Sequence, residues 1–416
     1  MNYKRLFCLL LCCCAVFAAC GCADSSGDDQ PGFGTIMTQA PQLNFGELES
    51  GKLEILPWNT GRLGFTSGNT MEETASGYYY AHNGNLVYAD KTNLQLWLCV
   101  CSQPSCGHTN AAACSAKMEG SSFLPVNDRI VLEKSTASFP QYSQSLGNVL
   151  ASIAPDGSDM QAAYYLEEAM LKDAGATRCV LFPDCWLYFS NTLSADGSIQ
   201  AKMFKVDETG VSTVIDTAWG DRYPEFQNAA EWYRLCGDRY FYYEALSADA
   251  LFHFEEGALT SFDITHLPSQ GGYISGTTLR TFRTNSGYFD INVQTGETVC
   301  LAENQLTDSH AVILLPNCIV ESTLFWDSVD SREDGTPHAM TLFDGERWRT
   351  VALPKELQDA AQKDYIRMVG VASDRVFFML INGRTAGNPR TTSKLYCICL
   401  NSDSLAAEFC GEIAPQ

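Results

Sequence analysis

The chain has 416 residues, of which 45% are hydrophobic and 18% are charged, a composition that excludes an intrinsically disordered protein. Its formal net charge of −22 at pH 7 repels phosphate backbones, so nucleic acid is excluded as an expected partner. The same acidity disfavours broad contact with anionic lipid headgroups, so attachment to a membrane is expected to depend on acyl chains alone.

The N-terminus has the pattern of a secretory signal peptide over residues 1–19. Two basic residues, Lys4 and Arg5, precede an apolar run that ends in small residues. The run is shorter than the ~20 apolar residues of a transmembrane helix. FAAC at 17–20 resembles a bacterial lipoprotein signal, which predicts that Cys20 becomes the lipidated first residue of the mature chain. Cys22 is a weaker alternative for this position, and an unlipidated signal peptide is another.

The rest of the chain divides into a tether and a folded body. Residues 20–42 are rich in Ser, Gly, Asp, Pro and Gln and show no periodicity, which is typical of a flexible tether. From residue 43 to residue 416, short strands and polar turns alternate. The sequence therefore predicts a single large β-rich domain over 43–416.

Two classes of strand recur along this domain. Strands of the first class are aromatic or β-branched and often follow a polar turn, at 84–90, 128–134, 185–191, 238–244 and 374–380. Strands of the second class end in turns that contain Asp or Gly, at 148–157, 201–210, 287–296, 338–346 and 394–403. Asp-Gly and Thr-Gly supply the positive φ that tight hairpins require.

The spacing of these strands predicts a repeat architecture. With 94–100 and 251–254, the second class gives seven units whose starts lie about 50 residues apart, except for one interval of about 36 residues. Several strands per unit at this period are typical of a β-propeller. We therefore predict an all-β fold, a β-propeller of seven blades. The short interval leaves six or eight blades open, and a pair of β-sandwich domains is the alternative.

Helices are expected to be few and short. The best candidates are residues 163–174 and 354–363, and either of them could instead be an irregular excursion between strands. The second begins with a proline, which the first turn of a helix tolerates, and has Glu356 close behind it.

The densest cluster of reactive side chains follows the strand at 94–100. Cys101, Cys106, His108 and Cys114 offer three thiolates and one imidazole, which match a structural zinc site in ligand type and number. The spacing is not that of a common zinc finger. The alternatives are a loop closed by one disulfide, in which Cys99 could take part and His108 would be exposed, and free thiols. Four protein ligands would leave no open position for catalysis, so either closed form predicts a structural role.

The stretch GYYYAHNGNLVYADKTNLQLWLCVCSQPSCGHTNAAACSA, at 77–116, resembles a group of uncharacterised lipoproteins from gut Firmicutes. The similarity lies in the YYY strand, the Leu-Cys ending and the Cys/His/Cys loop that follows immediately. The rest of the chain resembles the group only in its repeated propeller-like strands. The resemblance implies an extracytoplasmic, membrane-tethered propeller and implies no activity.

Most of the other cysteines are expected to be reduced packing residues, with Cys236, Cys300 and Cys318 as examples. Cys397 and Cys399 lie on one face of a strand, ~6.6 Å apart at ~3.3 Å per residue, which is near the upper limit for a disulfide. Core packing is therefore the first interpretation of this pair, and a bond from the pair to Cys410 on a neighbouring strand is the second.

Other residues give weaker signals. The acidic loop at 327–334 has oxygen ligands suitable for calcium, but its spacing fails the EF-hand pattern, so a polar loop explains it equally well. Trp97, Trp186 and Trp326 fall inside strand patterns and are expected to pack in the core. Trp219, Trp232 and Trp348 are weak candidates for a carbohydrate platform.

The sequence shows no G-x-S-x-G elbow, H-E-x-x-H helix, P-loop or dinucleotide fingerprint, so no catalytic residue is nominated. We expect a binding or interaction module on the outer face of the cell membrane, held there by the lipid on Cys20. Its partner would be an extracellular protein or glycan. The alternative is an extracellular propeller hydrolase or lyase that acts on glycans.

Overall fold

The computed structural model describes residues 71–413 with internal gaps. These lie at 104–105, 109–113, 120–122, 127–128, 143–146, 168–177, 182–184, 194–198, 208–209, 219–231, 238–239, 245–248, 256–257, 264–271, 284–285, 307–310, 315–317, 324–337, 362–364 and 382–392. The signal peptide, Cys20 and the tether fall outside the described residues. Within the described part, no helix has the length and apolar character needed to cross a membrane.

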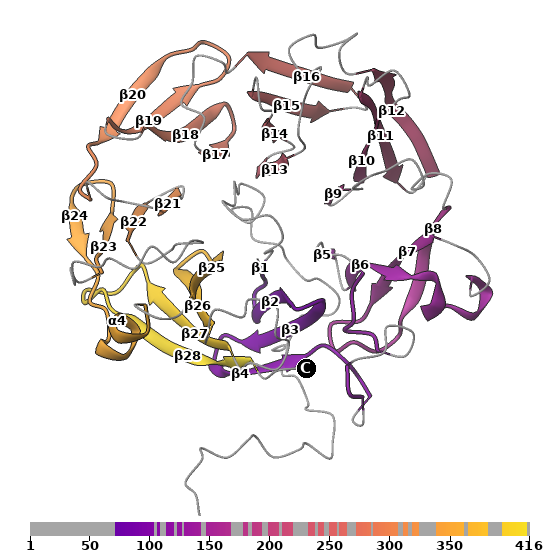
Figure 1. The fold of residues 1–416 in the computed structure, drawn as a ribbon, viewed down its shortest axis with the longest axis horizontal. Helices are drawn as coiled ribbons and strands as arrows, with labels where there is room; N and C mark the ends of the chain where they lie inside the picture. The colour runs from indigo at the N-terminus through magenta and orange to yellow at the C-terminus, as the bar shows by residue number, and fades with distance from the viewer. Residues whose placement is uncertain are drawn as a thin grey trace, which may run out of the picture. The chain divides into compact units, whose positions relative to one another are not determined.

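The described residues are mainly β-strands, which follow one another in seven groups of four (Figure 1). Group 1 has β1 (Met71–Glu73), β2 (Gly77–His82), β3 (Asn85–Asp90) and β4 (Asn93–Cys99). Group 2 has β5 (Phe123–Val126), β6 (Arg129–Ser135), β7 (Gly147–Ile153) and β8 (Gln161–Glu167). Group 3 has β9 (Arg178–Leu181), β10 (Trp186–Leu193), β11 (Ile199–Asp207) and β12 (Gly210–Ala218). Group 4 has β13 (Trp232–Gly237), β14 (Tyr240–Glu244), β15 (Asp249–Glu255) and β16 (Ala258–Asp263).

Group 5 has β17 (Gly272–Ser275), β18 (Thr278–Arg283), β19 (Gly287–Asn292) and β20 (Thr298–Ala302). Group 6 has β21 (Ala311–Leu314), β22 (Ile319–Ser322), β23 (Met340–Phe343) and β24 (Trp348–Thr350). Group 7 has β25 (Tyr365–Val371), β26 (Arg375–Ile381), β27 (Ser393–Cys399) and β28 (Ala407–Ile413). Among the described residues, the helical segments are α4 (Lys355–Ala361) and the short 3-10 turns η2 (Thr136–Ser138) and η3 (Pro140–Tyr142).

Within each group, every strand pairs antiparallel with the next one along the chain. Groups 2 to 6 each form a separate four-stranded sheet, whereas groups 1 and 7 join into one sheet of eight strands. The join is a parallel pairing between β4 and β28, at Leu96 and Glu412. The first and last strand groups in the sequence are therefore neighbours in space.

Gly411 permits the close approach of β28 to β4. Its φ is +129°, and a Cβ atom at this position would lie 2.8 Å from the carbonyl oxygen of Leu94 and 3.0 Å from that of Gln95. The indole Nε1 of Trp97 donates to the carbonyl oxygen of Cys410 at 3.3 Å. A side chain at residue 411 would therefore push the two strands apart.

Hydrophobic cores lie at four of the junctions between groups in the described part of the chain. One core combines apolar residues of groups 1 and 2, another those of groups 5 and 6, and a third those of groups 6 and 7 with Leu357 of α4. A fourth combines groups 1 and 7, where Tyr78 and Trp97 both contact the ring of Phe377 edge-on. Each of these junctions buries apolar surface that one group alone would leave exposed to water.

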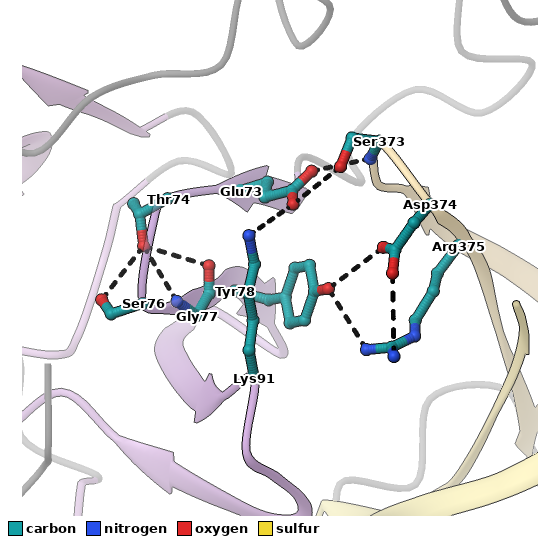
Figure 2. Close-up of polar contacts among 9 residues, drawn as sticks. All are labelled: Glu73, Thr74, Ser76, Gly77, Tyr78, Lys91, Ser373, Asp374 and Arg375. Atoms are coloured by element: carbon teal, nitrogen blue, oxygen red, sulfur yellow. Dashed lines mark hydrogen bonds and ion pairs between the residues drawn. The ribbon is translucent and has the colours of Figure 1, made fainter. Parts of the chain in front are cut away.

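A polar network also crosses the junction between groups 1 and 7 (Figure 2). Glu73 is fully buried, pairs with Lys91 at 2.6 Å, and accepts hydrogen bonds from the backbone N–H and the hydroxyl of Ser373 at 2.7 and 3.0 Å. The hydroxyl of Tyr78 lies 3.5 Å from a carboxylate oxygen of Asp374. These contacts satisfy a buried charge and join residues about 300 positions apart in the chain.

The strand classes expected from the sequence map onto these groups. The aromatic class provides the second strand and the turn-ending class the third, except in group 1, where the predicted 94–100 strand is the fourth strand β4. The short interval is genuine, because β15 begins at Asp249 and β19 at Gly287. The helix expected at 354–363 is confirmed as α4.

The helix expected at 163–174 is wrong in its described part, because residues 161–167 form β8. This segment contains Ala, Leu and Glu, which favour helices. Pairing along β7, including Leu150 with Tyr164, outweighs that weak local preference.

Candidate metal centre

The Cys/His segment connects β4 to β5 and is held against both of the groups that it joins. Gly157 lies in the turn after β7, with φ at +80°, and a Cβ there would be 2.3 Å from the carbonyl oxygen of Val100. The hydroxyl of Tyr79 donates to the carbonyl oxygen of Pro155 in the same turn at 3.4 Å. The backbone that leads into Cys101 is therefore fixed between groups 1 and 2.

The far end of the segment is fixed by the β2–β3 hairpin. The N–H of Leu86 donates to the carbonyl oxygen of Ala116 at 2.8 Å, and that of Met118 donates to the carbonyl oxygen of Gly84 at 2.8 Å. The hydroxyl of Ser115 donates to the carbonyl oxygen of Val100 at 3.4 Å. These bonds bring Cys114 back towards Cys101.

The structure brings together all four side chains that the sequence singled out. The Sγ atoms of Cys101, Cys106 and Cys114 and a ring nitrogen of His108 lie within 4.8 Å of one another. Nδ1 of His108 is 3.3 Å from Sγ of Cys114, and its backbone N–H donates to Sγ of Cys106 at 3.4 Å. Cys101 and Cys114 are buried, and Cys106 and His108 are partly buried.

The sulfurs of Cys101, Cys106 and Cys114 form no disulfide with one another, and Cys99 packs beside them. In a tetrahedral site with Zn–S bonds of ~2.3 Å, neighbouring sulfurs would be roughly 3.8 Å apart. Side-chain movements of about 1 Å would therefore convert the observed cluster into such a site. The arrangement suits a cation that is bound entirely by protein ligands.

The two buried thiols differ in acidity because they are hydrogen-bonded to each other. The bond with Cys114 lowers the pKa of Cys101 well below its ordinary value. The same bond, followed by burial and the charge on Cys101, raises the pKa of Cys114. A cation bound by both sulfurs would displace the protons that the two thiols hold.

Lys134 on β6 lies against the cluster and was missed by the sequence analysis. Its side chain is fully buried, and Nζ donates to the carbonyl oxygens of Cys114 at 2.6 Å, Ser115 at 3.4 Å and Lys117. Burial lowers the pKa of Lys134 to about 8. The alternation of side chains along β6 could have revealed its burial, because Lys134 lies on the same buried face as Ile130 and Leu132.

The other cysteines fall into three environments. Cys397 is buried in the core between groups 1 and 7, as the packing interpretation predicted, whereas Cys399 is only partly buried. Cys410 lies in the same core and is hydrogen-bonded to Cys397 without a disulfide. Cys318 is buried, as expected. Cys300 is exposed on β20, so the expectation that Cys300 packs in a core is wrong. The side chain of Cys236 lies outside the described residues.

The two tryptophans whose side chains are described form no open carbohydrate platform. Trp97 is buried, as expected. Trp348 packs against the rings of Tyr288 and Phe343, which is a core contact and not an open platform. The side chains of the other tryptophans named above, and the whole acidic loop at 327–334, lie outside the described part of the chain.

Comparison with known proteins identifies no family. No protein-family model matches the chain, and no curated protein matches it. Among solved structures, it is similar to a xyloglucanase from Xanthomonas campestris, with 10% identity, a TM-score of 0.41, and coverage of 81% of this chain and 52% of that chain. It is also similar to a post-proline cleaving enzyme from Rickettsia typhi, with 7% identity, a TM-score of 0.43, and coverage of 83% and 53%.

A third similar structure is an acylaminoacyl peptidase from Pyrococcus horikoshii, with 8% identity, a TM-score of 0.37, and coverage of 88% of this chain and 52% of that chain. The chain spans about half the length of these three proteins. At this level of similarity, nothing about activity follows.

Proposed function

We propose that the protein is an extracytoplasmic binding module built on a seven-bladed β-propeller, in which each four-strand group is one blade. The observation that carries this proposal is the pairing of β4 with β28, which makes the first and last groups neighbours. The cores shared by groups 1 and 2, by groups 5 and 6, and by groups 6 and 7 support it. An experimental structure tests it: we expect seven blades around one axis, and two separate sandwiches would overturn the proposal.

We infer that Cys101, Cys106, His108 and Cys114 bind one zinc ion. Their ligand atoms already lie within 4.8 Å of one another, and three sulfurs with one imidazole suit zinc. With four protein ligands, the ion has no open position for a substrate, so its role is structural. It would fix the connection between the first two blades.

Metal analysis of protein prepared under reducing conditions, without chelators, tests the zinc site. We expect one zinc ion per chain, lost in Cys106→Ser and His108→Ala. Cys300→Ser is the matched control, because this exposed cysteine lies outside the cluster and should leave zinc bound. A metal-free wild type with a disulfide within the loop would overturn the proposal in favour of the loop closed by one disulfide.

Attachment to the outer face of the cell membrane through Cys20 is part of the same proposal. It is supported by the signal-like N-terminus and the polar tether. Two acyl chains, at ~0.8 kcal/mol per buried CH₂, anchor a protein stably where one does not. With a fatty-acid probe, Cys20→Ser should lose the label and Cys22→Ser should retain it. An unlabelled wild type released into the medium would contradict the anchor.

The binding role is distinguished from catalysis by two assays on the same protein. Cross-linking on intact cells should capture an extracellular protein or glycan, and a screen of glycan substrates should show no turnover. Turnover of a glycan without a stable partner would overturn the binding role and support the hydrolase or lyase alternative.

A further inference from the structure

Lys134 carries a positive charge into the junction between groups 1 and 2, where its side chain is fully buried. Its three hydrogen-bond acceptors are neutral carbonyl oxygens of residues 114, 115 and 117. Among the residues that the structure describes, no carboxylate lies within 4.0 Å of Nζ to form an ion pair. A buried ammonium needs an anionic partner, because carbonyl dipoles replace lost hydration only in part.

The nearby thiolates can provide that partner. Lys134 interacts electrostatically with the sulfurs of Cys114, Cys101 and Cys106 and with the carboxylate of Glu119. A divalent cation with three thiolates and a neutral imidazole has a net charge of −1, and one lysine brings the sum to zero. With three neutral thiols, or with a disulfide and one thiol, the lysine would keep only the exposed carboxylate of Glu119, which lies beyond ion-pair distance, among the negative groups given for it in the described residues.

We propose that Lys134 is the counter-charge of a divalent metal site with three thiolates. Its positive charge favours the ligand set in which all three cysteines are deprotonated and His108 is neutral. The inference rests on the zinc site proposed above. Lys134 also holds the Cys114–Lys117 backbone in place through its hydrogen bonds. Its charge and its positioning role must therefore be separated experimentally.

The first test measures zinc affinity by competition with a chromophoric chelator. Replacing Lys134 with methionine keeps the bulk and removes the charge, and the affinity should fall on the order of 10- to 100-fold, as for other outer-shell partners. Lys134→Arg should stay much closer to the wild type. Glu321→Gln is the control, because it perturbs another buried charge, at the junction of groups 5 and 6, and should leave zinc affinity unchanged.

The second test asks whether charge alone restores binding. Cys106→His changes the ligand set to two thiolates and two imidazoles, so the site becomes neutral and no longer needs the lysine. We expect Cys106→His to weaken zinc binding when Lys134 is present, and the double variant Lys134→Met/Cys106→His to bind more tightly than Lys134→Met alone. A purely structural lysine would give losses that add, with no rescue.

The outcomes separate the two proposals. A wild type without zinc overturns the metal site and this inference together. If the wild type binds zinc, two results overturn the role of Lys134 and leave the metal site intact. One is a zinc affinity of Lys134→Met equal to that of the wild type, and the other is additive losses of affinity in the double variant. If Lys134→Met does not fold, recovery of the fold in the double variant supports the inference, and failure of both variants to fold overturns it.

Discussion

Glu321 shows how single residues hold neighbouring groups together. It is fully buried on β22 and accepts hydrogen bonds from the hydroxyl of Tyr288 at 2.6 Å and from the backbone N–H groups of Gln305 and Leu306. Burial, followed by the bond to Glu321, raises the pKa of Tyr288, so its hydroxyl stays protonated and keeps donating. Glu73 and Lys134 are the corresponding buried charges at two other junctions.

At the scale of residues, we predict that Tyr288→Phe lowers the free energy of unfolding by about 1.5–3 kcal/mol, the usual value of a hydrogen bond to a charged group. Tyr396→Phe is the matched control, because the buried hydroxyl of Tyr396 has no hydrogen-bond partner among the residues that the structure describes, so its removal should cost nothing. Urea denaturation of both variants measures the difference. Equal losses in the two variants would contradict the role given to Glu321.

At the scale of elements, β28 depends on the absence of a side chain at Gly411. We predict that Gly411→Ala destabilises the protein by about 1–3 kcal/mol more than Gly296→Ala. Both glycines have positive φ, but a Cβ at Gly296 meets nothing within 4 Å, so the control isolates the contact with β4. Thermal and urea unfolding measure the two costs. A Gly411→Ala variant no less stable than the control would show that β4 and β28 do not depend on this approach.

At the scale of the whole molecule, metal binding and global unfolding should be linked. A ligand that binds only the folded state stabilises it by about 4 kcal/mol at a thousand times its dissociation constant. Because the Cys/His segment is held by groups 1 and 2 together, we predict that a zinc chelator lowers the melting temperature of the wild type. The same chelator should have no effect on Cys106→Ser. Calorimetry measures both, and a wild type indifferent to the chelator would refute the link.

The sequence by itself determined the local features. Alternating strands and Asp- or Gly-containing turns depend on neighbouring residues, so the strand groups, the short interval and α4 could be read from the sequence. Four ligands within 14 residues of Cys101 could be recognised in the same way. Local preference failed where pairing with another strand decided the conformation, as at residues 161–167.

Only the tertiary structure decided the contacts between distant residues. The join of β4 to β28, the approach of Ser373 to Glu73 and the carbonyl oxygens around Lys134 all depend on which groups pack together. No pattern within a strand specifies such a neighbour, because period-2 alternation fixes which side chains are buried and not what they meet. Strand β6 is an example. Its alternation places Lys134 on the buried face, but only the fold shows that the ammonium group of Lys134 lies near the thiols of the cluster.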